Sequence, residues 1–371
     1  MKVYQAISYD PHKMGNPYIY SLMDEIDRMY GDVEWVYGDI FWQDEIYSVD
    51  IVHVHWPTEL FWGAKCRHSI SEIESRFLEI KGRGVKIVAT CHNLVPHYSD
   101  SIDEHTVYEI TYKQADMILH MGEYSCNLLK EKYTAAKHEI LPHHIYDTIY
   151  PLNVERGESI KRLHLKAKNK YILCFGAFRD KEETDLVLDL IRNLNDKSIY
   201  VLAPTFNWRY YVNSLFVKLH NRETSFRIRH LSWLHRIFER LLISYFKYKY
   251  HVILTCKKFN PVPDNLLPYY YGVSDLCLIH RKKILNSGNV PMAMMMGKVI
   301  VGPNVGNVSE LLNKMCNPTF DPEVLSSLYL AVMHGFELVN SNKGDYNKEY
   351  ALNNLNTSRI ATLLHHYYQE M

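Results

Sequence analysis

Short apolar runs alternate with helix-length segments along residues 1–150, and this alternation restricts the fold more than any other feature of the sequence. Six runs have the character of strands, at 3–8, 33–38, 50–56, 85–92, 116–122 and 138–144. Four of the segments between them show helical patterns, at 17–30, 69–82, 104–115 and 123–133. Strands that alternate with helices in this way pair in parallel, so we predict a doubly wound α/β sheet with helices on both faces.

A second series of the same kind follows a polar stretch at 151–168. Its strand-like runs lie at 171–176, 199–204, 251–256 and 275–280, with helical patterns at 183–194 and 264–271. We therefore predict two Rossmann-like domains, at 1–155 and 156–345, facing a central cleft. The last segment, 346–371, is predicted to be a helix that can cross back to the first domain.

Composition excludes several classes of protein. The 371 residues hold 42 Lys and Arg against 42 Asp and Glu, so overall charge does not point to a nucleic-acid partner. Seven cysteines without a C-x-x-C pair suit reduced thiols. The N-terminal residues lack the apolar run of a signal peptide, and no stretch approaches the roughly 18 apolar residues of a membrane span. We therefore expect a cytoplasmic protein.

Residues 206–250 interrupt the second series and carry most of the charge asymmetry. They hold nine Lys or Arg against two Glu, a net charge of +7. Aromatic and aliphatic residues alternate with the cations, as in an amphipathic helix on an anionic membrane. We hypothesise that this insertion contacts a membrane surface near a lipid-linked substrate. The alternative is that the apolar face packs on its own domain.

The stretch from 286 to 310 has the pattern of a loop, a helix, a strand and a second helix. Ser287, Gly288 and Asn289 are cap and turn residues, and Pro291 is tolerated only in the first turn of a helix. The free N–H groups of such a helix start favour a phosphate in front of Ser287 and Gly288. The same pattern also fits an ordinary loop-helix-strand unit of an α/β domain.

Polar or aromatic residues follow several strands of the first domain, where ligands of doubly wound sheets bind. Gly15 and Asn16 follow the first strand, Trp56 the third and His92 the fourth, with His97 in the loop beyond. A neutral histidine there can hydrogen-bond a hydroxyl or shuttle a proton, although it could equally be a packed structural residue. A metal site at His53 and His55 is conceivable, but no carboxylate or cysteine accompanies them and no Asp-x-Asp occurs at a strand end, so no metal is expected.

Six blocks in order resemble the GT-B glycosyltransferases, in particular the bacterial branch near the retaining family that uses nucleotide sugars. The blocks are GNPYIYSLMDEI (15–26), DIVHVHWP (50–57), VATCHNLVPH (88–97), HEILPHHIYDTIYP (138–151), FGAFRDKEE (175–183) and the run at 274–311. The resemblance covers about 1–200 and 250–340. It implies a GT-B fold, a nucleoside-diphosphate sugar donor and a metal-independent reaction.

The resemblance also implies roles for single residues. Arg179, with Lys181 at a shorter spacing than usual, would bind the diphosphate, and His92 would lie beside the transferred sugar. Further donor contacts are expected from Ser287, Gly288, Asn289, the backbone of Val290, and Glu310 on a donor hydroxyl. Acceptor or phosphate contacts are expected at Gly15, Asn16, Trp56 and His97.

One departure from that family concerns its pair of glutamates eight residues apart. Ile284 and Met292 stand at the two positions. We predict a glycosyltransferase of surface-polysaccharide synthesis that acts on a lipid-linked glycan acceptor. Two rivals stay open, a nucleotide-sugar epimerase on the same fold and a non-catalytic subunit that binds donor or docks a partner enzyme.

Overall fold

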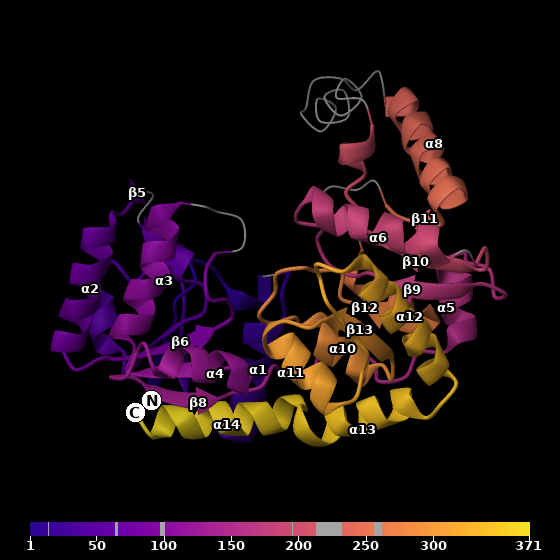
Figure 1. Ribbon diagram of the computed structural model, residues 1–371. Helices are drawn as coiled ribbons and strands as arrows, with labels where there is room; N and C mark the ends of the chain where they lie inside the picture. The colour runs from indigo at the N-terminus through magenta and orange to yellow at the C-terminus, as the bar shows by residue number, and fades with distance from the viewer. Residues whose placement is uncertain (14, 64–65, 97–100, 195, 213–231, 256–261) are drawn as a thin grey trace.

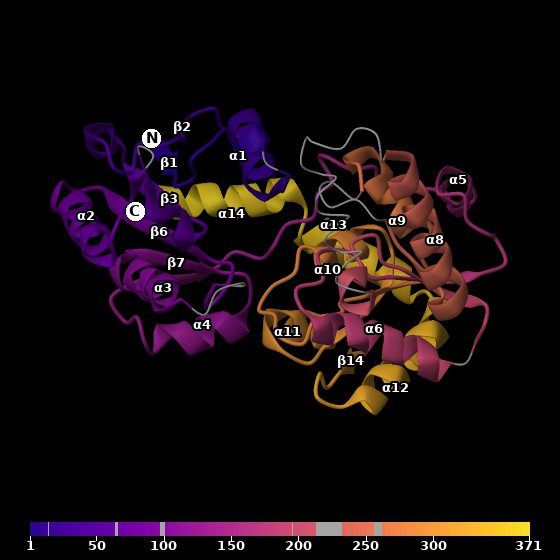
Figure 2. The same ribbon diagram turned by 90° about the horizontal axis from the view of Figure 1, so that it is seen from above.

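The computed structural model describes residues 1–13, 15–63, 66–96, 101–194, 196–212, 232–255 and 262–371. They form two α/β domains side by side, and the last helix runs from the second domain along the first (Figure 1 and Figure 2). The predicted fold class, two doubly wound domains, is confirmed.

The first domain contains a six-stranded parallel sheet in the order β2-β1-β3-β6-β7-β8. Strands β3 and β7 are buried at every residue, because helices cover both faces of the sheet. The strands are β1 (Lys2–Gln5), β2 (Glu34–Val36), β3 (Ile51–Val54), β6 (Lys86–Cys91), β7 (Met117–His120) and β8 (Lys137–Ile140), with a small ribbon of β4 (Trp62–Gly63) and β5 (Cys66–Arg67). The helices are α1 (Tyr18–Met29), α2 (Ile70–Gly82), α3 (Ile102–Gln114) and α4 (Glu123–Lys130).

The second domain has a parallel sheet in the order β11-β10-β9-β12-β13-β14, so the strand order reverses between β9 and β12. The strands are β9 (Lys170–Leu173), β10 (Ile199–Leu202), β11 (Val252–Ile253), β12 (Leu276–Leu278), β13 (Val299–Pro303) and β14 (Thr319–Phe320). The helices are α5 (Arg156–Arg162), α6 (Lys181–Leu194), α8 (Ser232–Tyr250), α9 (Leu267–Val273), α10 (Asn289–Met295), α11 (Gly306–Lys314), α12 (Leu325–Val339) and α13 (Lys343–Asn354). Strand β14 was not predicted, because two residues are too short to show a period.

The C-terminal segment is two helices that belong to different domains. Helix α13 packs on α10, whereas α14 (Thr357–Gln369) packs on α1 of the first domain. Asn356 separates them, because its side-chain oxygen accepts the backbone N–H of Arg359 at 2.8 Å and starts the new helix. Buried residues of α14 join the core of the first domain with Val3, Ile7 and Leu22, among others.

A polar seam connects the domains at the N-terminus of α4. The carboxylate of Glu310, on α11, accepts the backbone N–H groups of Glu123 at 3.1 Å and Tyr124 at 2.7 Å. Asn307 Oδ1 accepts the next one, from Ser125, at 3.1 Å. These N–H groups have no partner within their own helix, so the second domain caps a helix of the first.

Gly122 is required for this close approach. A Cβ atom there would lie 2.9 Å from the Asn307 side chain and 3.0 Å from the Glu310 carboxylate. Asn286 extends the seam, because its Nδ2 donates to the carbonyl oxygens of Cys91 at 3.0 Å and His92 at 2.9 Å. The seam therefore reaches the strand end that carries His92.

We predict that Glu310→Ala weakens the seam without unfolding either domain. Loss of a charged helix cap costs about 1 kcal/mol, which for a domain of this size lowers the thermal midpoint by about 2–4 °C. Differential scanning calorimetry measures the change. Glu337→Ala, on the exposed face of α12, is the matched control and should leave the midpoint unchanged. Equal midpoints for Glu310→Ala and the control would contradict the capping role.

Candidate active site

A cavity of about 850 Å³ lies between the two domains, and both contribute to its wall. The lining residues follow β1, β3, β6 and β8 of the first sheet and β9, β10 and β12 of the second. Ligands of doubly wound sheets bind at these carboxyl ends. The volume also lies in the range of small-molecule sites. The cavity is therefore the candidate ligand site.

Two arginines flank the point where the strand order of the second sheet reverses. Arg179 follows β9 and Arg281 follows β12, and both line the cavity. Arg281 is 8% exposed, and its Nη1 lies 3.1 and 3.2 Å from the two carboxylate oxygens of Glu183. The same carboxylate accepts the backbone N–H of Arg179 at 2.7 Å. Glu183 thus positions both arginine segments at the crevice.

Opposing effects act on the pKa of the Glu183 carboxyl. Burial raises its pKa, and the backbone N–H of Arg179 and the charge of Arg281 act against that rise. A guanidinium fork can bind a phosphate through two parallel hydrogen bonds. Arg179 and Arg281 therefore give this end of the cavity the chemistry of an anion site.

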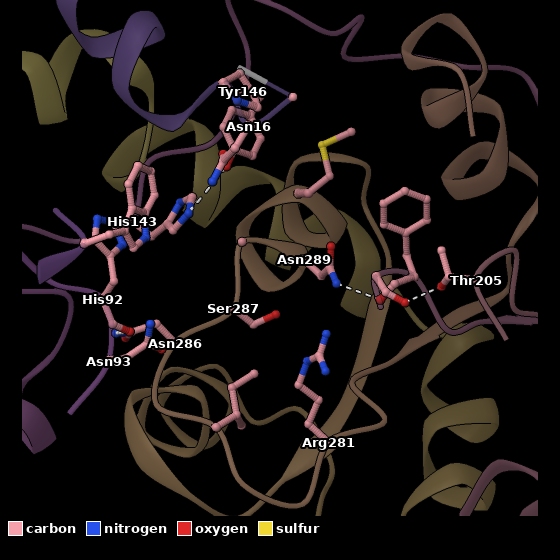
Figure 3. A pocket seen from close by; sticks show the side chains of 18 of the residues that line it. Asn16, His92, Asn93, His143, Tyr146, Thr205, Arg281, Asn286, Ser287 and Asn289 are labelled. Atoms are coloured by element: carbon pink, nitrogen blue, oxygen red, sulfur yellow. Dashed lines mark hydrogen bonds between the residues drawn. The ribbon is translucent and has the colours of Figure 1, made fainter. Parts of the chain in front are cut away.

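Ser287, Gly288 and Asn289 form the part of the wall between the arginines and the first domain. Helix α10 begins after Gly288, and Pro291 lies in its first turn, as predicted. The side-chain Nδ2 of Asn289 donates to the carbonyl oxygen of Phe175 at 2.8 Å and so fixes the loop after β9. The Ser287 hydroxyl and the Arg281 guanidinium point into the same space (Figure 3).

Gly288 also lies close to the segment that follows β8. A Cβ atom there would lie 3.1 Å from Nε2 of His143 and 3.3 Å from the hydroxyl oxygen of Tyr146. Both residues belong to the segment after β8. A larger residue would push this segment away, so the absence of a side chain keeps the cavity narrow at this point.

His92 lines the cavity on the side of the first domain. Its Nε2 lies 3.2 Å from Nδ1 of His55, and the Trp56 ring stacks on it at a centroid distance of 5.3 Å and an angle of 21°. Gly15 and Asn16 line the cavity before α1, and the Asn16 Oδ1 accepts the backbone N–H of Tyr18 at 3.1 Å. The structure thus brings together residues from three strand ends.

Three of the described residues expected at the site do not line this cavity. Lys181 lies on the exposed side of α6, where its Nζ is 2.5 Å from the Asp185 carboxylate. The Val290 side chain, on α10, is buried in the core of the second domain, and Glu310 caps α4 in the seam. These positions do not support the predicted donor contacts of Lys181 and Glu310. His97 lies outside the described residues.

Arg281 was missed from the sequence, and His143 and Asn286 were assigned no role in the site. Arg281 follows the strand predicted at 275–280 directly, so the strand-end rule could have found it. It stands in the run His280-Arg-Lys-Lys283, which looks like an exposed basic loop. Its burial against Glu183 depends on a helix about 100 residues earlier in the chain.

Ile284 and Met292 line the cavity. These are the two positions at which the resembled family carries glutamates. Met292 is 2% exposed and packs in the core of the second domain. An apolar wall thus replaces a carboxylate pair, and any contact to a ribose must come from other groups.

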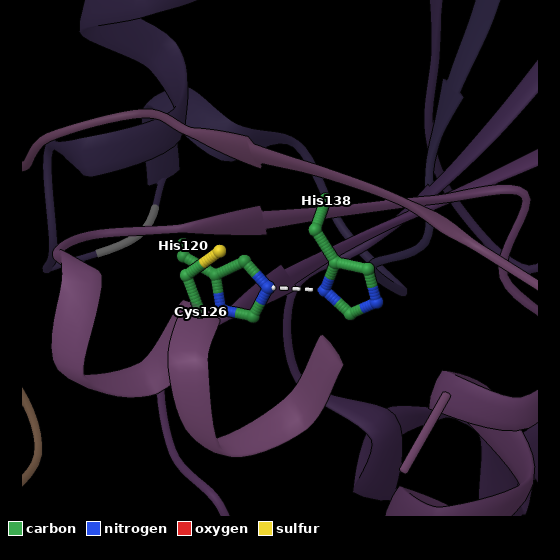
Figure 4. Close-up of side chains that lie close together, drawn as sticks. All are labelled: His120, Cys126 and His138. Atoms are coloured by element: carbon green, nitrogen blue, oxygen red, sulfur yellow. Dashed lines mark hydrogen bonds between the residues drawn. The ribbon is translucent and has the colours of Figure 1, made fainter. Parts of the chain in front are cut away.

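One cluster of potential metal ligands occurs among the described residues. His120, Cys126 and His138 place a ligand atom each within 4.8 Å of one another (Figure 4). Nε2 of His120 and Nδ1 of His138 are 2.9 Å apart and joined by a hydrogen bond. Burial raises the pKa of the Cys126 thiol. The arrangement is satisfied as a hydrogen-bonded pair, and none of the three residues lines the cavity.

Several histidines around the first sheet are buried and neutral. Burial lowers the pKa of His53 and of His120 to about 3 and that of His143 to about 4. It holds the pKa of His55 and of His144 well below the ordinary value. Near neutral pH these rings therefore act as hydrogen-bonding groups without charge.

No family model and no curated protein sequence matches this chain. Comparison with solved structures shows that the chain has the two-domain GT-B fold. The sucrose-phosphate synthase of Thermosynechococcus elongatus superposes with a TM-score of 0.67 at 12% identity, over 100% of this chain and 98% of that one. Anabaena HepE in complex with UDP gives 0.68 at 11% identity over 100% of both chains. The UDP-forming trehalose-phosphate synthase of Burkholderia vietnamiensis gives 0.60 at 11%, over 100% and 99%.

The buried histidines predict a stability that falls in mild acid. Their folded-state pKa values lie below the unfolded value of about 6.5, so the unfolded chain binds more protons as the pH falls. The stabilisation is complete above pH 6.5 and is lost below it, by up to about 1.4 kcal/mol per pH unit for each histidine. Thermal midpoints at pH 8.5, 7.5, 6.5 and 5.5 measure the effect. His144→Gln should reduce the slope below pH 6.5, and a midpoint that rises on acidification would contradict the account.

Proposed function

We propose that this protein is a glycosyltransferase that transfers a sugar from a nucleoside-diphosphate sugar to a glycan acceptor. One observation carries the proposal: Arg179 and Arg281 flank the strand-order reversal of one GT-B domain and face His92 of the other across a single cavity. The arginines supply positive charge where a diphosphate leaving group develops negative charge.

In this reaction the bond between the anomeric carbon and the β-phosphate oxygen breaks, and its electron pair stays on the diphosphate. The acceptor hydroxyl bonds to the same carbon, and its proton passes to solvent. Arg179, Arg281 and Ser287 bind the departing diphosphate, while His92 accepts a hydrogen bond from a hydroxyl of the transferred sugar. The apolar Ile284 and Met292 leave ribose recognition to backbone groups around α10.

The first donors to test are uridine nucleotides, since HepE has been solved with UDP and with UDP-glucose. A thermal-shift series with UDP, ADP, GDP and dTDP identifies the base, because a ligand that binds only the folded state raises the midpoint. The transfer itself needs no metal in this proposal. Activity should therefore persist in excess EDTA.

We predict that Arg179→Ala lowers kcat/KM for the donor by about 100-fold or more, because an electrostatic contact to the leaving group is lost. Lys181→Ala is the matched control two residues away. Its cation pairs with Asp185 outside the cavity, so its kcat/KM should stay within about twofold of wild type. Wild-type turnover in Arg179→Ala would refute the assignment of the diphosphate site.

A second candidate is a non-catalytic subunit that binds the donor. The replacement of the glutamate pair by Ile284 and Met292 in the cavity wall favours it. Donor hydrolysis or transfer, abolished by Arg179→Ala, excludes this candidate. Nucleotide binding without turnover across a panel of acceptors would favour it instead. Conversion of the donor to its epimer without any acceptor would identify an epimerase.

The acceptor that we propose is a lipid-linked glycan of surface-polysaccharide synthesis, reached at the cytoplasmic face of the membrane. Helix α8 supports this. It buries Leu242 and Phe246 in the domain core but exposes a neighbouring stripe of Ile237, Leu241 and Tyr245. Among the described residues no helix has the length and apolarity to cross a bilayer.

Basic side chains flank the exposed stripe of α8. Arg236 and Arg240 lie beside its first half, and Lys247 and Lys249 beside its second half. Figure 1 shows the helix at the edge of the second domain, away from the first. An apolar stripe with cations on both sides fits the interface of an anionic membrane. Arg227 and Arg229 of the predicted insertion lie outside the described residues.

We predict that reversing Arg236, Arg240, Lys247 and Lys249 to Glu lowers binding to vesicles with 30% phosphatidylserine by about 100-fold or more, since each cation contributes about 1 kcal/mol at such a surface. Co-sedimentation measures the binding.

The control reverses four exposed lysines of the first domain, Lys86, Lys113, Lys130 and Lys132, and changes the net charge equally. This variant should bind vesicles like wild type. Undiminished vesicle binding of the α8 variant would contradict the proposed membrane contact. It would not affect the transferase proposal.

A further inference from the structure

We infer that a buried hydrogen-bonded chain from Tyr368 through Gln5 and His55 holds His92 in the tautomer that carries its proton on Nε2. When the His92 ring carries a single proton, Nδ1 is then the nitrogen that accepts a hydrogen bond. Gln5, His55 and Tyr368 are thus positioning residues for His92. The consequence for turnover rests on the proposed function, but the tautomer itself does not.

Gln5 defines the direction of the chain. It lies on β1, is 1% exposed, and its Oε1 lies 2.8 Å from Nε2 of His55. An amide oxygen has no proton to donate, so it can only accept. His55 must therefore carry a proton on Nε2.

The His55 ring links the Gln5 amide to His92 in the cavity wall. The ring is 4% exposed, and burial holds its pKa well below the ordinary value, so it is neutral with a single N–H group. That proton is on Nε2, which leaves Nδ1 bare. Nδ1 lies 3.2 Å from Nε2 of His92. The proton of this hydrogen bond must come from His92.

The Tyr368 hydroxyl lies on the nitrogen side of the Gln5 amide. Nε2 of Gln5 donates to the Tyr368 hydroxyl oxygen at 3.4 Å. The hydroxyl is then free to donate its own proton to Nδ1 of His53, at 2.5 Å, and His53 donates from Nε2 to the Thr90 hydroxyl at 2.7 Å. Burial keeps His53 neutral, so each donor in the chain has one acceptor.

The hydroxyl that accepts from the amide comes from the far end of the chain. Tyr368 is 2% exposed on α14, more than 360 residues from Gln5, and its ring meets His53 edge-on at 5.7 Å and 84°. If the Gln5 amide were reversed, its nitrogen would donate to Nε2 of His55. Both His55 and His92 would then take the opposite tautomer. The crossing of α14 to the first domain (Figure 2) therefore brings a C-terminal hydroxyl into the hydrogen-bonded chain that ends at His92.

The test is the tautomer of His92 read directly by long-range ¹H–¹⁵N correlation on protein labelled with ¹⁵N-histidine, with the His92 signals assigned from His92→Gln. Wild type should show His92 protonated on Nε2. Tyr368→Phe removes only the hydroxyl, so a population protonated on Nδ1 should appear. Turnover should fall about three- to tenfold, the range expected from loss of one hydrogen bond.

Two substitutions of Gln5 form a matched pair. Gln5→Leu removes the acceptor of the His55 proton and should release the tautomer, whereas Gln5→Glu keeps an acceptor oxygen and should retain the Nε2 form of His92. A merely structural role of Gln5 would not separate the two. If Gln5→Leu does not fold, Tyr368→Phe decides.

A wild-type His92 protonated on Nδ1 would overturn the inference. A tautomer unchanged in folded Tyr368→Phe would do the same. The proposed function fails separately: if the tautomers respond as described but His92→Gln turns over like wild type, His92 has no part in the reaction and the hydrogen-bonded chain remains.

Discussion

The geometry of the cavity depends on a few hydrogen bonds that cross between the domains. Its two walls belong to different sheets, so nothing within either domain fixes the distance from His92 to the arginines. Asn286 joins the second domain to the carbonyl oxygens of Cys91 and His92, while Asn307 and Glu310 hold the start of α4. Asn307 also donates to the Asn286 side chain at 2.7 Å, so the contacts form one connected network.

Much of the architecture could be predicted from the sequence, because burial between two helical layers leaves long apolar runs at strand positions. The strand ends were predictable for the same reason. Once the sheets are parallel, Gly15, Trp56, His92 and Arg179 must lie at the facing edges, and the structure places all four in the cavity wall.

The residues that were misplaced have partners that their position after a strand does not show. Lys181 is in the first turn of α6, and its side chain extends along the helix surface to Asp185 instead of toward the cavity. Glu310 looked like a residue near the start of its own helix, but its partner is the backbone of α4, nearly 190 residues earlier. Arg281 stands in a basic run of the sequence. Only the fold shows that it is buried in an ion pair with Glu183.

The docking of α14 has a consequence for the order in which the chain can fold. Ile360, Ala361, Leu364 and Tyr368 fill the core that Val3, Ile7 and Leu22 begin. During synthesis part of the apolar surface of the first sheet therefore stays uncovered until nearly 370 residues have been made. Contacts of such long sequence separation slow folding and leave surface exposed to aggregation. The second domain lacks this dependence on the first strands and can become compact while the first domain is still incomplete.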